Sequence, residues 1–359
     1  MLASNSPLNR LFVFIMAGGS GERFWPMSRT SSPKHLLCLL GETTLLEQTV
    51  RRFEQSVPWE QIFILTNIAQ VEATKAALPF FPHENIIAEP CKRDTAPAVA
   101  LATALATRKR ADALVALFPA DAMIHDTATF QEQLHEAAAI AAEQEALLTF
   151  SITPHQPATG FGYLDLGEKI ISKTKTTFQK VNRFVEKPTL EKAEEFLASG
   201  NYGWNAGMFL WQAITFIAEC ERLQPALATF IHEVIKAASA EKFISEKFST
   251  LPKISVDYAI MEKASHVIAA VARFDWDDVG SWNALPKHLG VDENKNCIKT
   301  RRTVFTLDST NNIAISQEKP IALCGVHDLV VVETADALLI CHRDAVEKIK
   351  QLSLPQELR

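Results

Sequence analysis

The segment between residues 11 and 34 has the residue types that a polyphosphate site needs. Residues 11–16 form a short, continuous apolar run, which is typical of a strand buried on both faces of a sheet. The run leads into Gly18-Gly19-Ser20-Gly21, where the missing Cβ atoms let backbone N–H groups approach a ligand closely. Arg23 adds a planar, forked cation and Lys34 a mobile one. Together these residues predict a site for a nucleoside triphosphate.

Two common glycine loops are excluded by the spacing. A dinucleotide-binding fingerprint that starts at Gly19 would need a third glycine where Phe24 stands. A Walker A loop needs Gly-Lys-Ser/Thr, and this tripeptide occurs nowhere in the chain. A glycine turn that only links a strand to a helix is the remaining alternative, but it explains neither the two cations nor Pro26 and Pro33 around them.

Two carboxylates are candidates for holding a metal ion. Asp121 follows the predicted strand 113–118 directly after Pro119-Ala120, and Asp278 lies in Trp276-Asp277-Asp278-Val279-Gly280. Mg²⁺ prefers one or two carboxylates together with phosphate oxygens and water. Carboxylates that flank one bound phosphate are what metal-assisted nucleotidyl transfer requires, so we predict Mg²⁺ at Asp121 and Asp278. The neighbouring Asp277 remains an alternative to Asp278.

Polar residues that follow two later strands could bind a sugar phosphate. Glu186-Lys187 ends the predicted strand 179–186, and Asn205 lies in Trp204-Asn205-Ala206-Gly207. Carboxylate and amide groups suit hexose hydroxyls, and a lysine can neutralise a phosphate. A surface ion pair or a helix cap explains each motif equally well. The loop 89–98 is similarly open, because Asp94 or Thr95 can cap the following helix and also face a ligand.

Composition indicates a globular protein of about two domains. The chain has 359 residues, of which 47% are hydrophobic and 22% are charged. The net charge of −6 gives no overall positive field, so we expect no nucleic-acid or anionic-membrane partner. The six cysteines contain no C-x-x-C pair, which is typical of reduced thiols, and no apolar stretch is long enough to span a membrane. The expected location is therefore cytoplasmic.

The order of the elements predicts an α/β fold. Apolar strand-like runs alternate with helical patterns through the first half of the chain, which favours βαβ units and a doubly wound, mostly parallel sheet. Ligands bind such sheets outside the carboxyl ends of the strands, where the loops after Met16 and Phe118 both fall. The predicted strands are 11–16, 62–66, 85–88, 113–118 and 146–152, and the predicted helices are 44–54, 68–78, 95–108 and 127–145.

The last part of the chain has a different pattern. Short strand-like runs lie at 304–307, 313–316, 321–324, 329–333 and 337–341, followed by a predicted helix at 344–352. Their close spacing predicts a small, solenoid-like β domain. We therefore expect a nucleotidyltransferase domain over 8–290 and a C-terminal β domain over 294–359. Exposed strand edges are templates for association, so a homodimer is one expected assembly.

Taken in order, the motifs resemble those of the bacterial mannose-1-phosphate guanylyltransferases, also called GDP-mannose pyrophosphorylases. The resemblance covers roughly residues 11–350. It implies a GT-A-like, Rossmann-like nucleotidyltransferase domain, a left-handed β-helix-like C-terminal domain and a single-function form without a fused isomerase domain. It also implies that GTP and α-D-mannose 1-phosphate give GDP-mannose and pyrophosphate, with Mg²⁺. The motifs that carry it begin at Ala17, Pro33, Glu89, Pro119, Phe184, Trp204, Asp257 and Asp278.

The resemblance also implies roles for individual residues. Arg23 and Lys34 would be the catalytic cations, and Asp121 and Asp278 would bind the metal. The nucleotide would lie against Ala17, Gly18, Gly19, Ser20, Gly21, Glu89, Thr95 and Ala120, and the sugar phosphate against Gly160, Glu186, Lys187 and Asn205.

Four positions differ from the family pattern: Asp94, Ala122, His35 and Ala206 stand where Asn, His, Gln and Ser are usual. An acid at Asp94 could alter the nucleotide preference or only cap a helix. The reaction that we expect is an in-line attack of the sugar phosphate on the α-phosphorus, because the nucleophile is already anionic and needs no general base. A same-fold enzyme for another nucleotide or hexose phosphate, and a non-catalytic sugar-nucleotide sensor, are the alternatives.

Overall fold

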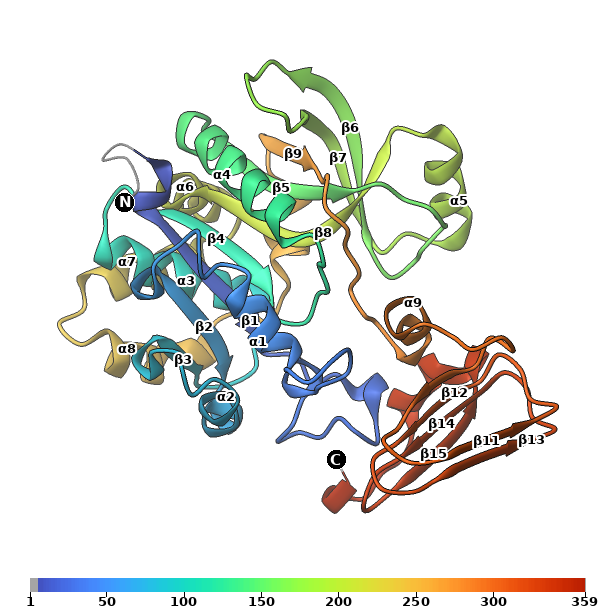
Figure 1. The fold of residues 1–359 in the computed structure, drawn as a ribbon. Helices are drawn as coiled ribbons and strands as arrows, with labels where there is room; N and C mark the ends of the chain where they lie inside the picture. The colour runs from blue at the N-terminus through green and yellow to red at the C-terminus, as the bar shows by residue number, and fades with distance from the viewer. Residues whose placement is uncertain (1–5, 359) are drawn as a thin grey trace.

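The computed structural model describes residues 6–358, in which a large mixed sheet carries helices on both faces. The strand order of this sheet is β3-β2-β1-β4-β8-β5-β9-β7-β6. Figure 1 shows a second, all-β lobe at the C-terminal end, beside the segment that follows β1. The strands of the large sheet are β1 Leu11–Ala17, β2 Ile62–Asn67, β3 Ile86–Glu89, β4 Leu114–Pro119, β5 Leu147–Ile152, β6 Gly162–Ile170, β7 Phe178–Glu186, β8 Tyr202–Gln212 and β9 Val267–Val271.

Two hydrophobic clusters cover the two faces of the large sheet. One includes apolar side chains of α3, α6, α7 and α8, and the other includes those of α1 and α4. None of the helices in residues 6–358 is long and apolar enough to cross a membrane. The helices are α1 Leu45–Arg51, α2 Val71–Ala77, α3 Thr95–Lys109, α4 Thr127–Glu143, α5 Leu190–Ser199, α6 Ala213–Leu223, α7 Pro225–Lys236, α8 Ala240–Lys247 and α9 Leu285–Leu289.

The expected α/β class is confirmed, but the expectation of a mostly parallel sheet is wrong for one half of it. Strands β1 to β4 pair in parallel, as the βαβ pattern predicts. Strand β8 instead runs antiparallel to β4, β5 and β6, and β7 runs antiparallel to β6 and β9. Apolar patterning identifies strands but not their partners, and β8 reaches its place between β4 and β5 only through tertiary contacts.

The C-terminal lobe is a short stack of parallel strands. Strands β10 Cys297–Lys299, β12 Ile313–Ser316 and β14 Leu329–Glu333 pair in parallel, and β15 Leu338–His342 adds an antiparallel edge. Strands β11 Val304–Leu307 and β13 Ile321–Cys324 form a second parallel pair. The buried Asn312 side chain donates to Asn296 Oδ1 at 2.9 Å and to the Val326 carbonyl at 3.0 Å, and so ties successive turns together.

A third hydrophobic cluster joins the two lobes directly behind the glycine loop. Phe24 is fully buried, and its ring lies 5.0 Å from that of Trp282. The same cluster contains Val346 and Ile349 of the 3₁₀ helix Arg343–Gln351, which closes the C-terminal lobe. The conformation of the glycine loop therefore depends on both lobes.

Candidate active site

The glycine turn after β1 brings Lys34 against its own backbone. Gly21 has φ +64°, and a Cβ atom built on it would lie 2.3 Å from Lys34 Cβ and 2.8 Å from Lys34 N. Only glycine fits this position, because both the left-handed backbone and the close approach exclude a side chain. The turn thus fixes where the lysine leaves the backbone.

The Lys34 ammonium lies between two predicted metal ligands. Its Nζ atom is 2.8 Å from Asp121 Oδ2 and donates to the Asp278 carbonyl at 2.6 Å. The Lys34 side chain is only 8% exposed. A buried cation held in this way connects the end of β4 to the segment after β9, although the two are far apart in sequence.

Asp121 and Asp278 face the same cavity, of about 390 Å³, but their environments differ. Burial favours the neutral form of Asp121, yet the charge and hydrogen bond of Lys34 outweigh it and hold the pKa of Asp121 below its usual value. Burial raises the pKa of Asp278 to about 6, and the nearby charges of Asp277 and Asp121 add to this effect although Lys34 opposes it. The second carboxylate therefore lacks a full counter-charge.

This donor set fits a hard divalent cation that is completed by substrate. Within the described part of the chain, no group of three or more His, Cys, Asp or Glu side chains is placed to hold a metal. Two carboxylates line one cavity, and the raised pKa of Asp278 indicates that nearby cations do not fully balance its charge. Such a pair suits Mg²⁺, which takes few protein ligands and completes its coordination shell with phosphate oxygens and water.

The two adjacent acids after β9 have separate surroundings. The Asp277 side chain contacts Lys287 Nζ at 2.8 Å and His288 Nε2 at 3.3 Å, while its backbone pairs with Met123. Burial opposes ionisation of Asp277, but these hydrogen bonds keep its pKa well below the usual value. Asp278, by contrast, lines the cavity that contains Lys34. The geometry therefore favours Asp278 over Asp277 as the cavity carboxylate.

Three cavities meet at Asp121. A cavity of about 300 Å³ contains Thr95 and Gly19, the cavity of about 390 Å³ contains Gly21 and Arg23, and one of about 230 Å³ contains Gly160. Asp121 lines all three. Three compartments that converge on one carboxylate can hold three parts of a reacting complex side by side.

The smallest of these cavities contains most of the predicted sugar-phosphate residues. Gly160, Glu186 and Asn205 all line it. Asn205 Nδ2 donates to Asp257 Oδ1 at 3.1 Å, and burial, followed by the charge of Glu186, raises the pKa of Asp257 to about 7. Lys187 does not line this cavity; its Nζ atom binds Glu186 Oε1 at 2.5 Å.

The predicted nucleotide residues fall into two groups. Gly19, Ser20, Gly21 and Thr95 line cavities of the site, and Thr95 Oγ1 accepts a hydrogen bond from Val256 N at 2.8 Å. The other four lie behind or beside them. Ala17 is the buried last residue of β1, and Ala120 is buried just after the end of β4. Burial raises the pKa of Glu89 to about 7, and Gly18 lies beside the Glu89 carboxylate.

Asp94 caps helix α3. Its side chain accepts a hydrogen bond from Thr95 N at 2.8 Å, and its backbone has φ +67°. The capping interpretation of this position is therefore confirmed. The negative charge of Asp94 also contributes to the raised pKa of Asp257, so the acid is within electrostatic reach of the sugar side.

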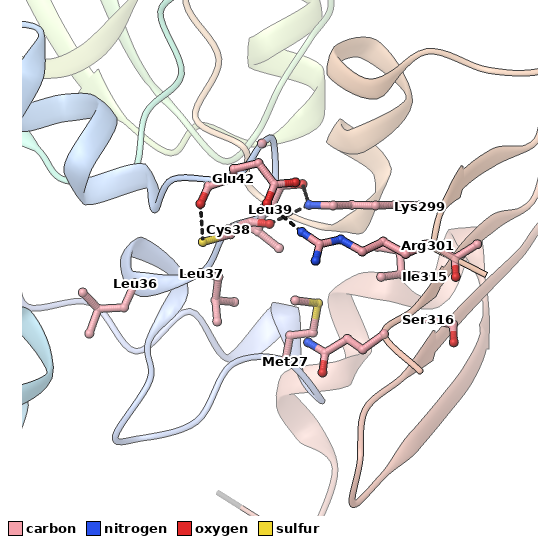
Figure 2. Close-up of a pocket in the computed structure, with 13 residues that line it drawn as sticks. Met27, Leu36, Leu37, Cys38, Leu39, Glu42, Lys299, Arg301, Ile315 and Ser316 are labelled. Carbon is pink, nitrogen blue, oxygen red and sulfur yellow. Dashed lines mark hydrogen bonds and ion pairs between the residues drawn. The ribbon is translucent and has the colours of Figure 1, made fainter. Parts of the chain in front are cut away.

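A further cavity, of about 530 Å³, is not this site. It lies between the segment 36–42 and the C-terminal lobe, and Figure 2 shows its lining residues. Its two cations already have partners, because Lys299 donates to the carbonyls of Cys38 and Leu39 and Arg301 pairs with Glu42 at 2.7 Å. Among the described residues that line it, there is no acidic pair like that of the site above.

The fold and the site define a nucleotidyl transferase. Residues 13–293 match the family model described as Nucleotidyl transferase, and residues 301–353 match the MannoseP isomerase/GMP-like beta-helix domain. A mannose-1-phosphate guanylyltransferase from Klebsiella pneumoniae is 37% identical over 95% of this chain and 73% of its own length. The xanthan biosynthesis protein XanB of Xanthomonas campestris pv. campestris (strain B100) is also 37% identical, over 96% of this chain and 73% of its own length.

A solved structure supports the same relationship. The protein from Thermus thermophilus named mannose-1-phosphate geranyltransferase is 31% identical, with a TM-score of 0.85 over 95% of this chain and 98% of that one. This chain belongs to the mannose-1-phosphate guanylyltransferase family. The resemblance seen in the sequence motifs, and the enzyme class it implies, are confirmed.

Asp257 is a residue of the site to which the sequence pattern assigns no role, although it begins one of the motifs that carry the family resemblance. Asp257 lines two of the three cavities and holds Asn205. The sequence feature that could have indicated a role for Asp257 is a single acid in a segment without a strand pattern. Only the fold brings that segment to β8.

Gly21→Ala should destabilise the protein more than a glycine replacement with the same backbone conformation and open space. Gly200 provides that control, since it has φ +72° and nothing within 4 Å of an added Cβ. Each alanine incurs the left-handed backbone cost of about 1 kcal/mol, and Gly21→Ala also displaces Lys34, which adds about 1–3 kcal/mol. Urea unfolding measures both; equal losses would contradict the close approach.

Asp257 should make stability depend on pH. Its pKa is higher in the folded chain than in the unfolded one, so its contribution is greatest at low pH and is lost as pH rises from about 4 to about 7. Between these pH values the free energy of unfolding of the wild type should fall relative to that of Asp257→Asn, because asparagine does not titrate. The difference should change by at most about 1.4 kcal/mol per pH unit. Urea unfolding at several pH values tests this, and a constant separation between the two proteins would refute it.

Proposed function

We propose that this protein transfers GMP from GTP to α-D-mannose 1-phosphate, giving GDP-mannose and pyrophosphate. The observation that carries the proposal is the convergence of three cavities on Asp121, with Lys34 and Asp278 beside it. Family membership supports the same activity, since the Klebsiella pneumoniae relative is named for it.

Each cavity suits one part of the reacting complex. The cavity with Thr95 and Gly19 lies against the first turns of α3 and suits the nucleoside. The buried Glu89 does not line this cavity but lies beside Gly18 of the glycine turn. The cavity with Arg23 suits the triphosphate. The cavity with Gly160, Glu186 and Asn205 suits the hexose, whose hydroxyls need both donors and acceptors.

The chemistry requires positioning and charge stabilisation rather than a base. A phosphate oxygen of mannose 1-phosphate attacks the α-phosphorus in line, and the bond to the pyrophosphate oxygen breaks. Lys34 and Arg23 hold the phosphates in the central cavity and stabilise the charge that develops on the leaving group. Lys187, which is exposed beside Glu186, is the proposed partner of the incoming phosphate.

Mg²⁺ is the proposed cofactor, held by Asp121 and Asp278 together with substrate phosphates. When bound, it would neutralise charge on the phosphates during transfer. The chain itself contributes the spacing of the two carboxylates, which Lys34 maintains through Asp121 and the Asp278 backbone.

We further propose that the protein acts on these small molecules in the cytoplasm, without nucleic acid or membrane. The substrates are soluble, and the net charge is −6. A homodimer through the C-terminal lobe is supported by the edge strand β15, on which Leu338 and Ile340 are 55% and 61% exposed.

A substrate matrix tests the proposed activity. Pyrophosphate release should be fastest with GTP and mannose 1-phosphate among the four nucleoside triphosphates, each paired with mannose 1-phosphate or glucose 1-phosphate. A faster rate with another pair would assign the chain to a same-fold enzyme of different specificity. Binding of GTP without turnover of any pair would indicate a sensor.

Asp278→Asn should reduce metal-dependent turnover by at least about 100-fold, because metal-assisted charge stabilisation contributes several kcal/mol. Asp277→Asn is the matched control, since it removes the adjacent acid but leaves the cavity carboxylate in place. It should keep most of the turnover, with a lower unfolding midpoint from the lost Lys287 and His288 contacts. A loss confined to Asp277→Asn would move the metal ligand by one residue.

A further inference from the structure

The C-terminal 3₁₀ helix contacts the glycine loop as well as its own lobe. Val346 and Ile349 of this helix are buried in the cluster that contains Phe24 and Trp282. Further along the chain, the Leu358 carbonyl accepts a hydrogen bond from Trp25 Nε1 at 3.0 Å. The helix is therefore held against the segment that follows β1 by apolar and polar contacts.

One charged residue of this helix lines the cavity proposed for the triphosphate, here called the phosphate cavity, and a second pairs with Arg23 in its wall. Glu347 Oε2 is 2.7 Å from Arg23 Nε. Lys350 lines the same 390 Å³ cavity as Arg23, Lys34 and Asp278, although it belongs to the other lobe. The C-terminal lobe thus contributes side chains to the site.

The three cations that line this cavity differ in whether they already have a partner. Lys34 is bound by Asp121 and by the Asp278 carbonyl, and Arg23 is paired with Glu347. Within residues 6–358, the side chain of Lys350 has no hydrogen-bond or ion-pair partner, and the residue is exposed and lines the cavity. Unlike Lys34 and Arg23, Lys350 therefore has no carboxylate in the described part of the chain that balances its charge.

We propose that Lys350 binds the outer phosphates of the nucleotide, which leave as pyrophosphate, so that the C-terminal lobe completes the catalytic site. The inference rests on the proposed function, because it assigns a partner for the leaving group of that reaction. Arg23 and Lys34 are already paired with Glu347 and Asp121, so they cannot balance all the negative charge of a triphosphate. A lysine on the cavity wall provides the additional cation.

The other cations along the junction of the two lobes do not fit this role. Figure 2 shows Lys299 and Arg301 directed at the segment 38–42, where they bind backbone carbonyls and Glu42. Lys348 lies on the same helix as Lys350 but does not line the phosphate cavity. Lys348 is thus a matched control, with the same charge and the same helix.

Lys350→Ala should raise the KM for GTP roughly tenfold, the loss expected for one hydrogen bond to a charged group. The KM for mannose 1-phosphate should stay the same. In the reverse reaction, the KM for pyrophosphate should rise by a similar factor. Lys348→Ala should leave all three unchanged, and Lys350→Arg should restore most of the phosphate affinity. Equal effects of Lys350→Ala and Lys348→Ala would overturn the proposal.

Binding of inorganic pyrophosphate tests the inference without turnover. Isothermal titration calorimetry with Mg²⁺ should show roughly tenfold weaker binding to Lys350→Ala than to the wild type and to Lys348→Ala. If the wild type releases no pyrophosphate from GTP and mannose 1-phosphate, the proposed function fails, while this comparison still decides the role of Lys350. Identical affinities for the three proteins would refute that role.

Discussion

The site depends on one buried ammonium group. Lys34 Nζ binds the Asp121 carboxylate and the Asp278 backbone carbonyl together, and the missing Cβ of the left-handed Gly21 leaves room for the lysine in this place. Without this cation, two carboxylates would face one cavity with their charges opposed. Lys34 lowers the pKa of Asp121, so this carboxylate stays ionised. Lys34 offsets only part of the effect of burial on Asp278, whose pKa stays raised, so a divalent ion could supply the missing positive charge.

The position of Lys34 is set in turn by both lobes. The segment around Phe24 and Trp282 packs against Val346 and Ile349, so the glycine loop has the C-terminal helix behind it. The same helix also contacts the wall of the cavity, because its Glu347 pairs with Arg23. The small β lobe is therefore part of the environment of Arg23 and Lys34, the two proposed catalytic cations, because it contacts the segment that carries them directly.

Much of the local structure could be predicted from the sequence. The apolar run before Gly18 forms β1, and the helix that begins at Thr95 is capped by Asp94 as its sequence pattern predicts. The closely spaced runs after residue 294 form the parallel stack of the C-terminal lobe. These features depend on short-range patterns and on turn and cap chemistry, which a sequence displays directly. The motifs themselves also indicated the family.

Tertiary structure decided the features that depend on long-range pairing. Strand β8 inserts antiparallel between β4 and β5, which no periodicity indicates, and this places Asn205 beside Asp257. Which of Asp277 and Asp278 lines the cavity also required the fold, because two adjacent acids share one local sequence pattern but contact different segments. Residue types and their spacing are enough to indicate which chemical groups are available and where most strands and helices lie, because these depend on local patterns. Their convergence on one cavity required the packing of distant segments, such as those of Lys34 and Asp278, which are 244 residues apart in the chain.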